Sequence, residues 1–117
     1  MKPKNILIVL CSLIIFSMMV VTGWASLYEN VLIGGQKVLA EPWGVATMFD
    51  TYFAFLTFYF WVFYKESSHF SKLIWLILIL LLGNMAISAY LLWQLYRLPP
   101  RAPVAHILVR TPAAAKI

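Results

Sequence analysis

The chain has 117 residues, of which 63% are hydrophobic and 11% are charged, and its formal net charge is +5. Soluble domains carry about 25% charged residues, and a chain this short has too small an interior to bury so much apolar surface. The composition therefore argues against a soluble globular domain. The basic residues lie at segment ends and in the tail, a pattern that favours contact with lipid head groups and not with nucleic acid.

Three long apolar stretches predict transmembrane helices over residues 6–24, 43–64 and 73–96. Each has between about 19 and 24 residues, and a helix needs about 20 to cross the hydrocarbon core of a bilayer. The stretches lack the alternation of barrel strands, and helices satisfy their own backbone groups in lipid. The predicted fold class is an all-α membrane protein, with a three-helix transmembrane domain over residues 1–98.

The first stretch also resembles a secretory signal peptide. Lys2 and Lys4 precede its apolar core, and Gly23-Trp24-Ala25 fits a cleavage site. The core is longer than the usual apolar region of about 7–15 residues, so we expect an uncleaved signal anchor. Cys11, the single cysteine, cannot form an intrachain disulfide.

The connections between the predicted helices differ in character. Residues 25–42 contain a Gly-Gly break and fit either a short interfacial piece or a small cap over the helices. Residues 65–72 are a short polar hairpin, which makes the second and third helices antiparallel neighbours. Leu98-Pro99-Pro100 ends the third helix, because proline cannot continue its hydrogen bonds. Residues 99–117 then form an extended, flexible tail rich in Pro, Ala and Arg. Tryptophans lie near the predicted helix ends and are expected to anchor them at the membrane interfaces: Trp24, Trp43, Trp61, Trp75 and Trp93.

The orientation follows from the positive-inside rule. Three spans place the N-terminus and the 65–72 hairpin on one side, with Lys2, Lys4, Lys65 and Lys72. The opposite side then carries Lys37, Arg97, Arg101, Arg110 and Lys116. Charges near the first helix and in short loops weigh most, which predicts a cytoplasmic N-terminus in a multi-pass protein, with a bacterial inner membrane as the expected location.

A carboxylate within the second stretch is the strongest candidate for a functional group. Asp50 lies seven residues beyond Trp43, or about 10 Å along a helix. The same count inward from Trp24 reaches Ser17, and from Trp93 it reaches Ala86, which lies between Asn84 and Ser88. This predicts an intramembrane polar cluster of Ser17, Asp50, Asn84 and Ser88. Small side chains at helical spacing predict close helix packing at Ala54, Thr57 and Gly83.

Asp50 has three interpretations: a polar clasp between helices, a proton or ligand site, and a contact with a partner protein. An Asp at the bilayer centre costs about 2.5–3.5 kcal/mol, which hydrogen bonds or protonation would offset. Asp50 is then either part of a polar clasp between helices, the favoured interpretation, or a proton or ligand site. We expect no metal or cofactor, because His69 and His106 lie outside the apolar stretches without partners at metal-ligand spacing. We assign no catalytic residue, since the chain has no Cys-x-x-Cys, glycine-rich phosphate loop or nucleophile elbow.

The second half of the chain resembles a group of small polytopic membrane proteins of unknown function that occur in bacteria and plants. The resemblance covers roughly residues 42–100 and rests on "PWGVATMFDTYFAF", "FWVFYKESS" and "IWLILILLLGNMAISAYLLWQLYRLPP". It implies a membrane domain of three or four helices and singles out Pro42, Trp43, Asp50, Glu66, Gly83 and Tyr90. It implies no activity.

Three functions fit these observations. The leading hypothesis is an accessory subunit or assembly scaffold of a larger membrane complex, which contacts other membrane subunits or copies of itself through its helices and tail. The second is a small oligomeric transporter with Asp50 as the group that couples to protons or cations. The third is an enzyme that modifies a lipid or isoprenoid with Asp50 as general acid, but the absence of a visible partner base makes an enzyme less favoured.

Overall fold

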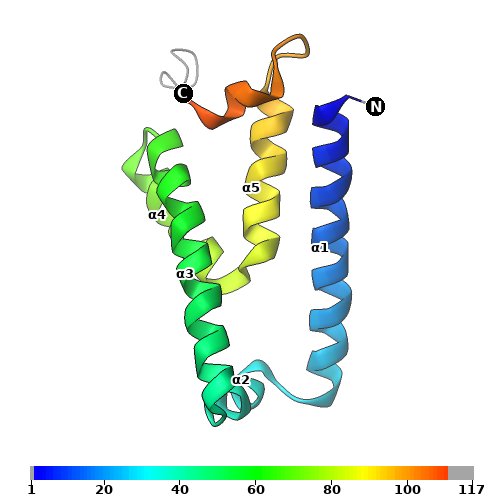
Figure 1. Cartoon of the computed structure of the whole chain (residues 1–117), viewed down its shortest axis with the longest axis vertical. Helices are drawn as coiled ribbons and strands as arrows, with labels where there is room; N and C mark the ends of the chain where they lie inside the picture. Colours follow the sequence, from blue (N-terminus) through cyan, green and yellow to red (C-terminus); the bar gives the residue numbers. More distant parts are fainter. Residues whose placement is uncertain (1, 111–117) are drawn as a thin grey trace.

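The computed structural model describes residues 2–110, which form five α-helices and one 3-10 helix and contain no β-strand. The helices are α1 (Pro3–Tyr28), α2 (Val31–Leu39), α3 (Pro42–Lys65), α4 (His69–Leu82) and α5 (Asn84–Arg97), followed by η1 (Val104–Leu108). Figure 1 shows α1 and α3 as two long columns, with α2 joining them at one end and α5 lying between them at the other. The all-α class is therefore confirmed.

The two long helices α1 and α3 are long and apolar enough to cross a membrane. Each begins with a proline in its first turn, where the missing N–H has no helical partner to lose. Within α1 only Cys11 is buried, and α3 buries Phe55, Val62 and Lys65. Many of their other apolar side chains are exposed, unlike those of a core helix in a soluble protein, and this favours a membrane location. The first two predicted helices lie within α1 and α3.

The prediction of one continuous helix over residues 73–96 is wrong. That stretch contains parts of two 14-residue helices, α4 and α5, on either side of Gly83. The chain reverses there, so that the ring centroids of Trp75 and Trp93 lie 5.9 Å apart in a stacked pair. In a straight helix those residues would be about 27 Å apart along the axis. Each helix of this α4–α5 hairpin is shorter than the ~20 residues that a span requires.

Gly83 is the reason for the reversal. Its φ of 59° lies in the left-handed region, which glycine adopts without the steric cost of a Cβ. It is also buried against α3, where an added Cβ would lie 2.7 Å from Cζ of Phe55. Hydropathy does not register this turn, because the apolar run continues through it.

The reversal changes which segments share an end of the molecule. The start of α1, the α3–α4 connection and the end of α5 all lie at one end, and α2 lies at the other (Figure 1). The residues after α5 therefore lie at the same end of the molecule as the N-terminus, whereas the prediction of three spans placed them at opposite ends. Lys4 Nζ donates a hydrogen bond of 3.5 Å to the carbonyl oxygen of Leu98, which directly connects the first helix to the end of α5.

The helices pack in two groups. α1 lies along α5, whereas α3 contacts α2, α4 and α5. The core contains Phe55, Val62, Ile79, Ala86 and Tyr90, contributed by α3, α4 and α5. Asn30 caps the start of α2: its side chain accepts a 2.9 Å hydrogen bond from the N–H of Ile33. Residues 25–42 are thus a helical connection and not an extended loop.

The turn at Gly83 predicts a specific sensitivity to a single methyl group. Gly83→Ala should lower the free energy of unfolding by about 1–3 kcal/mol, because the new Cβ is strained at positive φ and overlaps Phe55. The measurement is chemical denaturation of the purified protein in mild detergent. Gly23→Ala is the matched control, since a Cβ at Gly23 meets no atom within 4 Å. Equal stability of the two variants would contradict this account of the turn.

Candidate functional site

The structure does not join the predicted polar cluster by hydrogen bonds. Ser17, Asp50 and Asn84 are exposed and only Ser88 is buried. Within residues 2–110, no hydrogen bond or ion pair connects any of the four to another. The hairpin does not reach the level of Asp50 along α3. Its tip, Gly83, contacts Phe55, which is five residues and about 7.5 Å beyond Asp50, and this explains part of the separation between Asp50 and the residues of the hairpin. The polar clasp stays a prediction.

The predicted helix-packing residues and the predicted tryptophan anchors differ in how deeply the structure buries them. Gly83 packs closely against α3, whereas Ala54 and Thr57 are exposed, and Thr57 Oγ1 donates to the carbonyl oxygen of Phe53 in its own helix. Trp24 and Trp43 are exposed toward the α2 end. The remaining three tryptophans, Trp61, Trp75 and Trp93, gather around a single buried tyrosine.

The buried polar groups meet instead at Glu66, directly after α3. This side chain is 8% exposed. Its Oε1 accepts a 2.5 Å hydrogen bond from Ser71 Oγ in α4, and its Oε2 accepts a 2.9 Å bond from the hydroxyl of Tyr90 in α5. One carboxylate thereby ties the end of α3 to both helices of the hairpin. Buried carboxylates are costly unless their oxygens are hydrogen-bonded, and both oxygens of Glu66 are.

Tyr90 provides the apolar half of the same arrangement. It is fully buried, and four rings pack against it in edge-to-face geometry: Phe58, Trp61, Trp75 and Trp93. Such aromatic pairs contribute about 0.5–1.5 kcal/mol beyond the burial of their area. The rings exclude solvent around the Tyr90–Glu66 bond, so this bond forms in a low-dielectric surrounding, where it is stronger.

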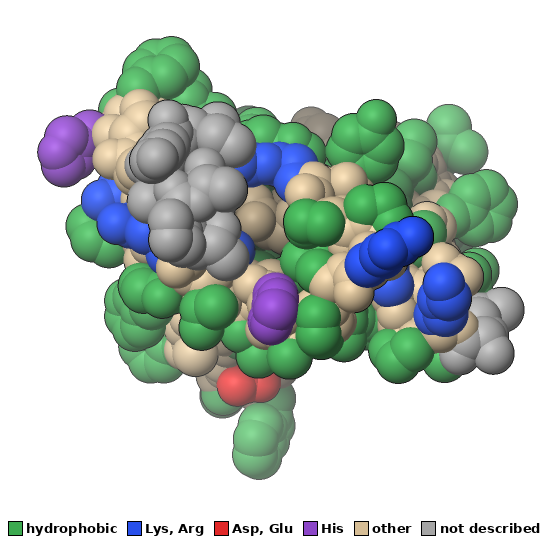
Figure 2. Space-filling model, turned by 90° about the horizontal axis from the view of Figure 1, so that it is seen from above, with side chains coloured by type: hydrophobic (Ala, Val, Ile, Leu, Met, Phe, Trp, Pro, Cys, Tyr) green, Lys and Arg blue, Asp and Glu red, His purple; other side chains and the backbone are tan. Residues whose placement is uncertain are grey.

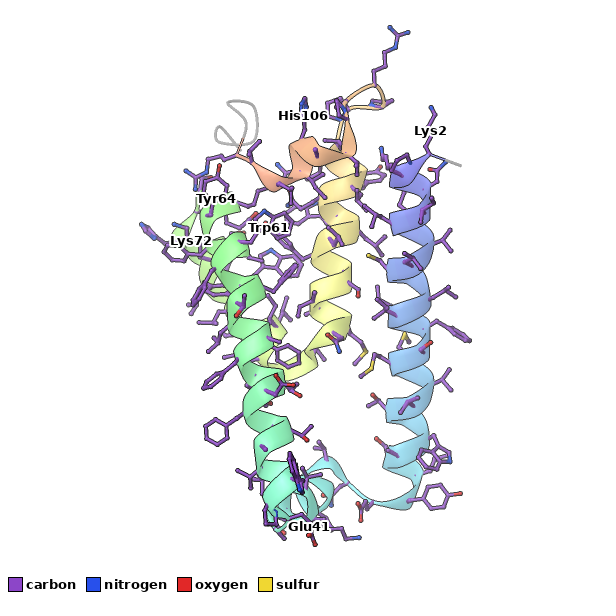
Figure 3. All side chains as sticks on the ribbon, in the orientation of Figure 1. Lys2, Glu41, Trp61, Tyr64, Lys72 and His106 are labelled. Atoms are coloured by element: carbon purple, nitrogen blue, oxygen red, sulfur yellow. The ribbon has the colours of Figure 1, made fainter. Side chains whose placement is uncertain are left out.

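The segment after α5 folds back over this site. Lys65 Nζ donates to the carbonyl oxygen of Val109 at 3.1 Å, and Arg110 Nη2 donates to the carbonyl oxygens of Tyr64 at 2.6 Å and Glu66 at 3.0 Å. Figure 3 shows Trp61, Tyr64 and Lys72 at the end of the molecule where this segment passes, with His106 above them. Trp61 Nε1 adds a 3.0 Å bond to the carbonyl oxygen of Leu108. Residues 104–110 are thus bound to the end of α3, a contact that the extended-tail prediction did not anticipate; residues 111–117 of that tail lie outside the described residues.

A small polar cavity opens beside Glu66, and we call it the hairpin pocket. Its volume is about 110 Å³, and its lining includes Lys65, Glu66, Ser68, Ser71, Gln94 and Arg97. Gln94 is 6% exposed, and its side-chain nitrogen has no hydrogen-bond partner within the described chain. A buried amide without a partner costs about 1–3 kcal/mol, and Gln94 places such an amide in the wall of the pocket.

The arrangement around Glu66 is suited to holding helices together and to binding a ligand, and not to acid–base catalysis. Both oxygens of Glu66 are engaged, so the carboxylate is not presented as a general base. In the described part of the chain, no three His, Cys, Asp or Glu side chains gather where a metal ion could sit. The pocket offers amide, hydroxyl and cationic donors instead.

Composition and spacing alone did not find this site. Glu66 and Tyr90 were singled out only by the resemblance to small membrane proteins, which also named Gly83. From the sequence alone, Glu66 is expected to be a solvated residue of the 65–72 connection, because it follows a lysine at a helix end. Tyr90 reads as one more aromatic residue in an apolar helix. The missing signal was the break at Gly83, which brings the two residues to the same end.

The Glu66–Tyr90 bond predicts a measurable loss of stability. Tyr90→Phe removes the hydroxyl donor and leaves one buried carboxylate oxygen without its partner, which should destabilise the protein by about 1–3 kcal/mol in detergent. Tyr96→Phe is the matched control on the same helix, because Tyr96 is 86% exposed and its change should stay within about 0.5 kcal/mol. A Tyr90→Phe variant as stable as the control would show that the bond contributes nothing.

Comparison with known proteins assigns the chain to a family without assigning an activity. No curated protein and no solved structure matches it. Residues 2–115 match the family described as "Protein of unknown function (DUF1475)", which covers nearly the whole chain, including both helices of the hairpin and the Glu66 site. The sequence-based expectation of an uncharacterised family is confirmed, and the chain belongs to the DUF1475 family of proteins of unknown function.

Proposed function

We propose that this protein is an integral membrane subunit that acts by contact, as an accessory or assembly component of a larger membrane complex. In this proposal α1 and α3 span the bilayer, and the α4–α5 hairpin enters it from one side and returns. The exposed apolar side chains of α1 and α3 and the resemblance to small polytopic membrane proteins of bacteria and plants support a location in the bilayer, the inner membrane in a bacterium.

The distribution of charge supports one orientation. The end that carries both termini of the described chain also carries Lys2, Lys4, Lys65, Lys72, Arg97, Arg101 and Arg110. Figure 2 looks down on this end and shows Lys and Arg side chains across it. Lys37 lies at the α2 end, where it pairs with Glu29. The positive-inside rule then places the basic end in the cytoplasm.

Reporter fusions test this topology. Fusions at Ser68 and after Arg110 should both report the cytoplasmic side, and a fusion at Lys37 should report the opposite side. A fusion after Arg110 that reports the same side as Lys37 would contradict the re-entrant hairpin, because a third span would then carry the chain across.

Contact with another membrane protein is supported chiefly by the position of Asp50. Asp50 is exposed about 12 Å along α3 from Pro42, and it forms no hydrogen bond or ion pair within residues 2–110. The hairpin turns back at the level of Phe55, so no other described helix lies between α1 and α3 around Asp50 (Figure 1). A lone carboxylate at this depth is costly, and a polar group of a neighbouring subunit would offset that cost.

The same observation carries a second candidate, a small oligomeric transporter. An ionisable side chain within a membrane segment is a functional-site hypothesis by default. Two spanning helices and a half-depth hairpin enclose no path by themselves, so transport would require several copies with Asp50 facing a shared interior. The two candidates differ in whether Asp50 must ionise or only needs to form hydrogen bonds.

Substitutions at Asp50 separate these candidates. If Asp50 contacts a partner subunit through hydrogen bonds, Asp50→Asn should keep the companions that co-purify in mild detergent, whereas Asp50→Leu should lose them. The measurement is mass spectrometry of the native complex, with Phe49→Leu as the control at the adjacent exposed position. An Asn variant that keeps its assembly but loses function in complementation would favour the transporter. A Leu variant with unchanged companions and function would contradict both candidates.

A further inference from the structure

We propose that the hairpin pocket binds a phosphate group, supplied either by the head group of a phospholipid or by a soluble phosphate compound. This inference does not depend on the proposed contact with another subunit, because it concerns the basic end of the molecule and not the surface around Asp50; only the access of a lipid head group rests on the proposed membrane topology.

The unsatisfied amide of Gln94 indicates that the pocket accommodates a hydrogen-bond acceptor. The side chain is 6% exposed, lines the pocket and has a nitrogen with no partner in the described residues. Buried polar groups almost always have partners, so an orphan donor beside a cavity points to an occupant with acceptor atoms. The volume of about 110 Å³ exceeds several times what one water molecule needs.

The charges around the pocket favour an anion. Lys65 and Arg97 contribute two positive charges and Glu66 one negative charge, so the lining has a net charge of +1. Both oxygens of Glu66 accept hydrogen bonds from protein hydroxyls, which offsets part of its repulsion of an anion. Lys65 donates one bond to Val109 and has two further N–H groups. A phosphodiester carries one negative charge and would neutralise the lining.

The backbone adds to this preference. Ser68 is the N-cap of α4, so the pocket lies beside the first turn of a 14-residue helix. The N-terminus of a helix carries a partial positive charge and favours anions such as phosphate. The helix end, the two cations and the orphan amide therefore converge on one ligand chemistry: an anionic group with several acceptor oxygens.

The position of the pocket keeps two sources of phosphate open. It lies at the basic end, where the hairpin enters the membrane in the proposed topology, so a phospholipid head group and a dissolved phosphate compound both have access. Arg97 also stacks over Trp93, with its guanidinium carbon 4.9 Å from the ring centroid, which holds the cation beside the pocket, and within residues 2–110 it forms no ion pair with a carboxylate.

Thermal unfolding of the full chain in mild detergent tests the proposal. The probes are inorganic phosphate, a short-chain phosphatidylglycerol and the corresponding diacylglycerol, which lacks phosphate. A ligand of the folded state raises the melting temperature with its concentration, and the shift yields a dissociation constant. Stabilisation by phosphatidylglycerol well above inorganic phosphate identifies a lipid ligand, and stabilisation by inorganic phosphate at least as strong identifies a soluble one.

Two variants tie the effect to the pocket. Arg97→Gln should raise the dissociation constant about tenfold or more, the result expected when one charge-assisted hydrogen bond is lost. Gln94→Leu should weaken binding similarly while leaving the ligand-free protein at least as stable, because it removes an unsatisfied buried amide. Arg101→Gln, an exposed change at the same end but outside the pocket lining, should bind as the unmodified chain does. The proposal is overturned if neither phosphate probe stabilises the protein, if the diacylglycerol stabilises it equally, or if Gln94→Leu binds unchanged.

Discussion

The reversal of the backbone at Gly83 is the constraint on which the rest of the structure depends. In the proposed topology this turn lies at membrane depth, where a turn is tolerated only if protein covers it, since lipid offers no partner to backbone N–H and C=O groups. Here the turn is buried against Phe55, and the hydrogen bond from the N–H of Gly83 to the carbonyl oxygen of Ile79 completes the end of α4. Because the chain turns back at this point, α5 reaches the end where α4 begins, and the Glu66 site can form.

Glu66 and Tyr90 hold the open end of the hairpin closed. The carboxylate bonds to Ser71 near the start of α4 and to Tyr90 on α5, while the aromatic rings around Tyr90 exclude solvent. The segment after α5 completes the cover: the carbonyl oxygen of Val109 accepts a hydrogen bond from Lys65, and Arg110 donates one to the carbonyl oxygen of Glu66. The hairpin is thus fixed at its tip by backbone conformation and packing, and at its base by a buried polar network.

Much of the fold follows from the sequence, and the errors share one origin. Apolar length and flanking tryptophans are sufficient to find α1 and α3. The same criterion joins α4 and α5, because the stretches before and after Gly83 are both rich in apolar residues and hydropathy carries no information on the sign of φ. That one missed turn placed Trp93 and the chain after α5 at the wrong end of the molecule. It also hid the Glu66–Tyr90 pair, whose residues are 24 positions apart in sequence and meet only if the chain folds back.

A half-depth hairpin also has a consequence for the way in which the protein enters its membrane. In the proposed topology only the connection around α2 must pass through the bilayer, because α4 and α5 start and finish on the side where they are synthesised. Neither helix is long enough to be stable alone in the hydrocarbon core. The two must therefore insert together after α3, with Gly83 leading. Phe55 then determines the order of insertion: α3 must be in the membrane first, because the backbone at Gly83 needs the ring of Phe55 to cover it.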